Sequence, residues 1–180
     1  MIGAELRARV RRDVAARTGL DEREATSIER FLELYDALDD PFSREADSIH
    51  VTGSGIVVGS RGVVMLKHKR LGIWLQPGGH VDEQETPWAA ALRESAEETG
   101  LDVSFAGPVD DDGVPALLHV DVHAGGRGHL HLDLRYLLDG GDADPAPPDG
   151  ESQEIGWFDW SRAIELADPG VETILRHLAP

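Results

Sequence analysis

The chain has 180 residues, 41% hydrophobic and 28% charged, a balance that suits one globular domain of ordinary size with a buried core. It contains no cysteine, which excludes disulfides, thiolate metal sites and cysteine nucleophiles. The formal net charge of -17 opposes lasting association with DNA or long RNA, so a small anionic substrate would need a neutralising partner such as a divalent cation.

The N-terminal part of the chain is predicted to be helical. Residues 2–17 contain strong helix formers without a breaker, and residues 22–38 place apolar side chains at mostly helical spacing. The composition changes near residue 45, which predicts a boundary between an N-terminal helical extension, residues 1–45, and an α/β domain, residues 46–180. The pattern leaves open whether the extension forms a homodimer interface or a lid.

Strands, one central helix and two closing helices are predicted for the rest of the chain. Residues 51–70 read as two strands around a Gly-containing turn, and two later segments alternate apolar and polar residues as strands do. The later predicted elements are strands at 117–124 and 129–138, a loop at 140–152, a strand at 154–160, and helices at 160–168 and 170–180. This order predicts an α/β sandwich with helices on both faces of a mixed sheet.

The sequence gives two indications of cellular location. No apolar run approaches the roughly 18 to 20 residues that a membrane span requires. The N-terminus contains several arginines but lacks the apolar segment of a secretory signal. The cytoplasm is therefore the expected location.

The central helix is predicted over residues 87–99. Thr86 can cap its N-terminus, Pro87 suits the first helical position, and Gly100 is a natural stop. On one side of this helix the carboxylates gather at spacings i, i+3 and i+4, within reach of a common point: Glu94, Glu97 and Glu98. The opposite side is predicted to be buried.

The crowded carboxylates have two interpretations. One is a solvated acidic face, the usual explanation of a run of charges. The other is a site for Mg²⁺ or Mn²⁺, which prefer hard carboxylate oxygens and keep room for water and phosphate oxygens. The second is favoured because like charges at these spacings destabilise a helix by roughly 0.2 to 0.5 kcal/mol per pair and no lysines offset them. The preceding Pro77-Gly78-Gly79 turn would also let the backbone approach a ligand closely.

A longer pattern around this helix resembles a known family signature. The sequence matches G-x5-E-x7-R-E-U-x-E-E-x-G-U, where U is a bulky aliphatic residue, the signature of Nudix hydrolases. The matching residues are Gly79, Glu85, Arg93, Glu94, Glu97, Glu98, Gly100 and Leu101. Ser95 departs from the pattern at an aliphatic position that faces the buried side. The wider resemblance spans about residues 48–178, and some Nudix subfamilies also look similar in the N-terminal helices.

The resemblance implies a Nudix-type α/β/α sandwich and a divalent-metal-dependent pyrophosphohydrolase, in which water attacks the diphosphate linkage of a small nucleoside diphosphate derivative. By position, the metal ligands would be Glu94, Glu97, Glu98 and the Gly79 carbonyl. Arg93 would pair with Glu85 and hold the loop against the helix. The general base would be one of the helix glutamates or a later acid, Glu151 or Glu154.

A second polar cluster lies on a predicted strand. Its polar side chains share one face, and they are His129, His131, Asp133 and Arg135. The strand before it has the same pattern, with His119, Asp121 and His123. Three interpretations stay open: a substrate wall with Arg135 gripping phosphate, a solvated sheet face, and a zinc site from the histidines. Lys69 and Arg70, which precede the segment that carries the signature (residues 79–101, called the box below), are further candidates for phosphate contact.

Three other functions are less consistent with the sequence. The same fold resembles that of an isopentenyl-diphosphate isomerase, but that chemistry needs a cysteine that this chain lacks. Nudix-like ligand-binding regulators often lose box glutamates, whereas all are present here. An RNA 5′-end hydrolase is disfavoured by net charge. The expected partner is therefore a small nucleotide, with neither a nucleic acid polymer nor a membrane, and the pattern does not identify which nucleotide.

Overall fold

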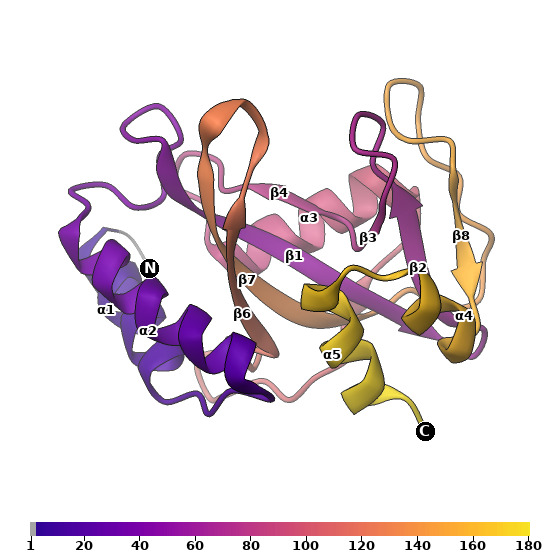
Figure 1. The fold of residues 1–180 in the computed structure, drawn as a ribbon, viewed down its shortest axis with the longest axis horizontal. Helices are drawn as coiled ribbons and strands as arrows, with labels where there is room; N and C mark the ends of the chain where they lie inside the picture. The colour runs from indigo at the N-terminus through magenta and orange to yellow at the C-terminus, as the bar shows by residue number, and fades with distance from the viewer. Residues whose placement is uncertain (1–2) are drawn as a thin grey trace.

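The computed structural model describes residues 3–180, apart from the Arg127 side chain, so residues 1 and 2 of the predicted extension lie outside the described part. In chain order, two helices precede the strands of an eight-stranded sheet, a third helix comes between β4 and β5, and two more helices end the chain (Figure 1). The helices are α1 (Ala4–Ala15), α2 (Glu22–Ala37), α3 (Pro87–Thr99), α4 (Trp160–Leu166) and α5 (Pro169–Leu178), with a short 3-10 turn at Gly126–Gly128. The strands are β1 (Ile49–Gly59), β2 (Gly62–Lys67), β3 (Trp74–Leu75), β4 (Gly78–His80), β5 (Ser104–Phe105), β6 (His119–Ala124), β7 (Leu130–Asp139) and β8 (Ile155–Phe158).

The sheet is mixed, as the order of elements predicted. Strands β1 and β7 run parallel from Ile49 opposite Leu130 to Val58 opposite Asp139, and they form its centre. Every other pairing is antiparallel, with β2 and β4 on β1, β5 and β6 on β7, and β3 and β8 on β2. The prediction of an α/β sandwich with an N-terminal helical region is therefore confirmed. The predicted strand at residues 117–124 is shorter and begins at His119.

Helix α3 packs closely on β1, and glycines make this possible. A Cβ on Gly53 would collide with the backbone of Pro87 and Ala91, and one on Gly55 would collide with the Ser95 hydroxyl. Figure 1 shows α3 behind the sheet and α4 and α5 in front of it. The helix that bears the carboxylates thus packs directly on the central strand β1 and lies beside β4.

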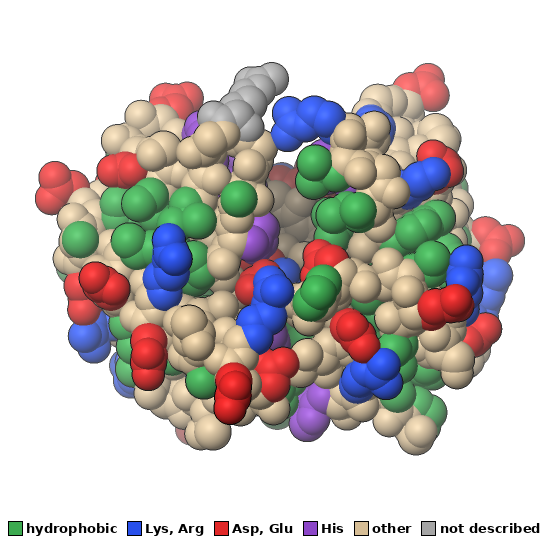
Figure 2. All heavy atoms as spheres, in the orientation of Figure 1, with side chains coloured by type: hydrophobic (Ala, Val, Ile, Leu, Met, Phe, Trp, Pro, Cys, Tyr) green, Lys and Arg blue, Asp and Glu red, His purple; other side chains and the backbone are tan. Residues whose placement is uncertain are grey.

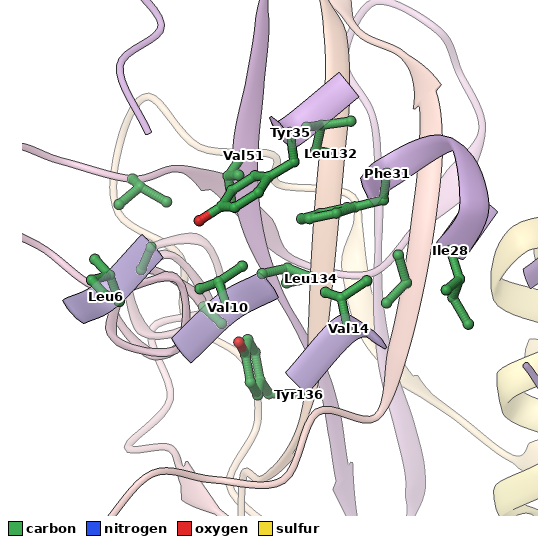
Figure 3. Close-up of a cluster of buried hydrophobic side chains, with 14 of the residues drawn as sticks. Leu6, Val10, Val14, Ile28, Phe31, Tyr35, Val51, Leu132, Leu134 and Tyr136 are labelled. Carbon is green, nitrogen blue, oxygen red and sulfur yellow. The ribbon is translucent and has the colours of Figure 1, made fainter. Parts of the chain in front are cut away.

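The first two helices share a core with the sheet. Side chains of α1 and α2 meet those of β1, β6 and β7 in one buried cluster (Figure 3). Its labelled members are Leu6, Val10, Val14, Ile28, Phe31, Tyr35, Val51, Leu132, Leu134 and Tyr136. A dimer contact or a lid would therefore have to use the outer, polar faces of these helices. Within the described residues, no helix is long and apolar enough to cross a membrane.

A buried carboxylate adds a polar link between α2 and the sheet. Glu24 accepts hydrogen bonds from the backbone N–H groups of Leu20 and Val120, at 2.7 and 3.0 Å, and pairs with Arg17. Because Glu24 is buried, each of these donors contributes to keeping its charge in the protein interior. This residue fixes the turn between α1 and α2 against the start of β6.

The shared core can be tested with Phe31, which is 0% exposed. We expect Phe31→Ala to lower the free energy of unfolding by about 3 to 5 kcal/mol, because it opens a cavity in the cluster that α2 shares with the sheet. All four tryptophans lie after residue 45, so tryptophan fluorescence during urea unfolding follows the part of the chain outside the extension. Glu29→Ala, on the exposed side of the same helix, is the control. A tryptophan transition unchanged by Phe31→Ala would mean that the extension folds separately.

Candidate metal-binding and catalytic site

The central helix begins and ends where its sequence predicts. The Thr86 side chain accepts a hydrogen bond from the Ala89 N–H at 3.3 Å, Pro87 occupies the first turn, and Gly100 ends the helix with φ of 69°. Its buried side includes Ser95, whose hydroxyl lies under Gly55 and has no hydrogen-bond partner among the described residues. The signature has a bulky aliphatic residue at this position, and the smaller serine side chain is consistent with the close approach of α3 to β1.

The three carboxylates of α3 lie in different surroundings. Glu98 is largely buried and accepts a hydrogen bond from the Gly78 N–H at 2.9 Å, and burial raises the pKa of its carboxyl to about 7. Burial also raises the pKa of Glu94, although Arg93 opposes this shift. Glu97 is 57% exposed and points along the helix surface. Two of the three negative charges are thus held partly out of water, which is unfavourable without a positive partner.

Arg93 supplies positive charge to this group. Its guanidinium donates to both Glu85 oxygens, at 3.0 and 2.9 Å, and to the His80 carbonyl at 3.0 Å. Its remaining nitrogen donates to Glu94 at 2.9 Å and to Glu97 at 3.2 Å. The pairing of Arg93 with Glu85 that the resemblance implied is therefore present, and Arg93 also pairs with Glu97. The loop before α3 is fastened to the helix by one residue.

The residues present fit a divalent cation in their chemistry. A Cβ on Gly79 would collide with the Glu94 carboxylate, so the β4 backbone lies directly against a hard oxygen donor. Glu94, Glu97 and Glu98 do not form a group whose oxygens all lie within 4.8 Å of one another, because Arg93 draws Glu97 and the Gly78 N–H draws Glu98. Gathering the set requires these side chains to turn, while the helix stays in place.

The other predicted basic and acidic residues lie on loops near the helix. Lys69 and Arg70 are exposed in the loop between β2 and β3, where the Lys69 ammonium contacts the Gly150 carbonyl. Glu154 is paired with Lys67 at 2.9 Å and lies 66% exposed. Glu151 is close enough to Glu98 that its charge helps raise the Glu98 pKa, after burial and Glu94. Of the two later acids, Glu151 is the one whose charge acts on Glu98.

The predicted phosphate contact of Arg135 is wrong. Arg135 is 2% exposed, and its guanidinium donates to Asp133 at 2.8 Å, to Asp121 at 3.1 Å and to the Gly170 carbonyl at 2.7 Å. Asp133 is 1% exposed and accepts from the hydroxyls of β1. This face is neither solvated nor open to substrate there, because the start of α5 covers it. These side chains do share one face, as alternation predicted, but there they form a buried ionic core.

The histidines at the other end of β7 are more accessible. His129 and His131 are partly exposed, and their ring centroids lie 5.1 and 5.2 Å from that of His50. His80 follows the glycines of β4 and lies 5.2 Å from His50 in the same measure. The sequence pattern did not single out His50 and His80, since their neighbourhood depends on the register of β1 with β4 and β7.

The surface is hollowed in this region. Figure 2 shows a hollow in the upper middle of the molecule, with histidine and acidic side chains at its walls. In the same orientation, the loop joining β6 to β7 and the loop joining β2 to β3 rise on either side of it (Figure 1). A ligand in this hollow would therefore lie between the two loops, one of which, the loop joining β2 to β3, carries the candidate residues Lys69 and Arg70.

Comparison with known proteins identifies the family to which this architecture belongs. A family model described as the NUDIX domain matches residues 49–178. Curated relatives include the RNA pyrophosphohydrolase of Agrobacterium fabrum, 32% identical over 105 residues, which are 53% of this chain and 61% of that protein. The RNA pyrophosphohydrolase of Brucella abortus is 31% identical over 102 residues, 52% of this chain and 57% of its own. The chain thus matches less than two thirds of the length of these relatives.

Solved structures agree with the family model. A hydrolase of the NUDIX family from Clostridium perfringens is 28% identical with a TM-score of 0.60, over 71% of this chain and 92% of its own. An Ap4A hydrolase of C. elegans is 20% identical with a TM-score of 0.55, over 70% and 92% of the two chains, a likeness of fold alone. The two N-terminal helices precede the region that the family model matches.

The role of Arg93 in holding the loop can be measured with a double-mutant cycle. Arg93→Lys loses the planar fork that reaches both oxygens of Glu85, and Glu85→Gln loses the charge. We expect a coupling of about 1 to 3 kcal/mol in the free energy of unfolding, because the pair lies partly out of water. Additive effects of the two substitutions would contradict the assignment.

His119 lies opposite Arg135 of the ionic core, and its burial predicts how the stability of the fold depends on pH. Burial, followed by the charge of Arg135, lowers the pKa of His119 to about 4, whereas an unfolded histidine titrates near 6.5. Between these values the unfolded state binds a proton that the folded state does not, so this residue makes stability fall as pH decreases. Relative to wild type, His119→Gln should therefore gain on the order of 2 kcal/mol between pH 7 and 4.5.

Urea unfolding of both proteins across this pH range measures the difference. Taking the difference removes the opposite contribution of Glu98, whose raised pKa stabilises the folded state as pH decreases. The His177→Gln variant, on the exposed end of α5, should follow wild type at every pH. A stability difference between wild type and His119→Gln that stays constant with pH would contradict a neutral, buried His119.

Proposed function

The chain belongs to the Nudix family, and we propose that it is a divalent-metal-dependent pyrophosphohydrolase that cleaves the diphosphate linkage of a small nucleoside diphosphate derivative. The observation that carries the proposal is the face of α3 that bears Glu94, Glu97 and Glu98 beside the glycine strand β4. All the glutamates of the signature are present, which favours an enzyme over the alternative, a Nudix-like domain that binds a ligand without hydrolysing it.

Each residue of the box has a distinct part in the proposal. Glu94, Glu97, Glu98 and the Gly79 carbonyl would hold a Mg²⁺ or Mn²⁺ ion, which when bound offsets phosphate charge and lowers the pKa of water. Arg93 acts as a positioning residue, because its hydrogen bonds to Glu85 and to the His80 carbonyl keep the β4 backbone beside Glu94. Without this clamp the donors would separate.

The general base lies among the acids around Glu98. A base must come within hydrogen-bond reach of the attacking water, so position is the first criterion. Glu151 is the better placed of the two later acids, since Glu154 is engaged by Lys67 at the edge of the sheet. We therefore assign the role to a box glutamate or to Glu151, and Glu154 becomes the less favoured candidate.

The substrate is proposed to be a small nucleotide. Lys69 and Arg70 supply positive charge in the loop beside the hollow and are suited to contact the phosphates of a bound nucleotide. The net charge of -17 disfavours a long polyanion. The names of the curated relatives nevertheless make RNA with a 5′-triphosphate a necessary member of any substrate panel.

The proposal is tested by incubating such a panel with Mg²⁺ or Mn²⁺ and separating the phosphorylated products by chromatography. The panel contains nucleoside di- and triphosphates, oxidised nucleotides, ADP-ribose, nucleotide sugars, dinucleoside polyphosphates and triphosphate-ended RNA. We expect turnover of at least one small nucleotide, and a loss of kcat of about 100-fold or more in Glu97→Gln and Glu98→Gln, which remove charge from the cation site. Glu165→Gln, on the exposed surface of α4, should keep full activity.

The possible results separate the candidate functions. Tight binding of one nucleotide without turnover of any would favour the ligand-binding alternative. Activity that survives unchanged in both Gln variants would contradict the metal assignment. Turnover of triphosphate-ended RNA but of no small nucleotide would overturn the proposed substrate class.

A further inference from the structure

Three histidines from three neighbouring strands meet at one point of the sheet. His50 comes from β1, His80 from β4 and His131 from β7, and each offers a ring nitrogen that lies within 4.8 Å of those of the other two. His50 lies directly opposite His131 in the parallel pair, and His80 lies opposite Thr52, two residues along β1. The strand register therefore brings the three rings to the same face.

This face is the one opposite α3. Gly79 lies opposite Gly53, and both face α3, where the Glu94 carboxylate lies. Successive residues of a strand point to opposite sides, so His80 turns away from the carboxylates. The imidazoles and the carboxylates are thus two separate donor groups, one on each side of the short strand β4.

His50 has a lone pair available for a ligand. Its side chain is 0% exposed, and its Nε2 atom has no hydrogen-bond partner among the described residues. Its Nδ1 atom lies 3.4 Å from the Asp47 carbonyl, an arrangement that places the proton on Nδ1. A carbonyl partner of this kind commonly orients a metal-binding histidine and leaves the other nitrogen free. Burying that nitrogen unpaired would otherwise be unfavourable.

We propose that His50, His80 and His131 form a second metal site, which takes a transition-metal ion of the Zn²⁺ type through three imidazole nitrogens. Imidazole suits zinc and its neighbours, whereas Mg²⁺ prefers oxygen. Zinc binds nitrogen at about 2.0 to 2.1 Å, so ring nitrogens in a tetrahedral site lie roughly 3.4 Å apart. Since the three nitrogens lie within 4.8 Å of one another, the rings need only a small closure to bind the ion. His129, whose ring lies 5.1 Å from that of His50, or a water completes the set.

One contact has to open for binding. The Arg44 guanidinium lies 3.3 Å from Nδ1 of His80, and because arginine only donates, this nitrogen accepts. Arg44 is exposed and its guanidinium can move into water, which leaves His80 free to present either nitrogen. Removing its positive charge should favour a cation nearby. Arg44→Gln is therefore expected to bind the metal at least as tightly as wild type.

The test uses the full chain, stripped of metal with a chelator, and Zn²⁺ or Co²⁺ alone as the probe. Calorimetry of a variant carrying Glu97→Gln and Glu98→Gln should show one Zn²⁺ site, since the carboxylate site is disabled and the histidines are intact. Adding His80→Gln or His131→Gln should weaken this binding at least 10-fold, because each removes a ligand. Both side chains are partly exposed, and a circular dichroism spectrum confirms that each variant is folded.

The control is His177→Gln, a histidine on the exposed end of α5, which should bind Zn²⁺ as its parent does. X-ray absorption of the Zn²⁺ complex should show the multiple-scattering pattern of imidazole ligands. Unchanged affinity in folded His80→Gln and His131→Gln variants would overturn the proposal. The proposal would also be overturned if the variant that carries only Glu97→Gln and Glu98→Gln bound no Zn²⁺. No substrate is used, so the result is independent of the hydrolase proposal.

Discussion

The clamp formed by Arg93 is the interaction on which the candidate site depends. Helix α3 carries its carboxylates close together, and like charges so placed repel. Arg93 lies among them and donates hydrogen bonds to Glu94 and Glu97, while its other nitrogens hold Glu85 and the His80 carbonyl. The same residue therefore neutralises charge on the helix and fastens the loop and strand β4 beside it. The glycines of β1 permit this by letting α3 approach the sheet.

The sheet separates two kinds of polar chemistry. On the α3 side, partly buried carboxylates lie beside β4, and Glu97 is exposed. On the other side, Asp121, Asp133 and Arg135 form a buried ionic core, and its hydrogen bonds reach the hydroxyls of β1 and the start of α5. Replacing one partner of such a network leaves an unpaired charge in the interior, so its members have to be retained together. The histidines continue this polar face to the end of the strands, where it becomes accessible.

Local patterns predicted the elements, and register decided what the sequence could not reveal. The limits of α3 follow from Thr86, Pro87 and Gly100, each of which acts through its nearest neighbours in the chain. The parallel pairing of β1 with β7 is a contact between distant segments, so nothing local indicated that His50 would face His131. Alternation correctly grouped Asp133 with Arg135, but it cannot tell a wet face from one covered by α5. Their burial required the tertiary structure.

The central claim is that the carboxylates of α3 bind a divalent cation beside the Gly79 backbone. A crystal of the protein soaked in Mn²⁺ and measured at the manganese absorption edge tests it most directly, because the anomalous signal locates the ion without reference to activity. The account predicts a peak coordinated by oxygens of Glu94, Glu97 and Glu98 and by the Gly79 carbonyl, with these side chains turned away from their present partners. Manganese bound elsewhere, with the carboxylates of α3 still engaged by Arg93 and Gly78, would contradict it.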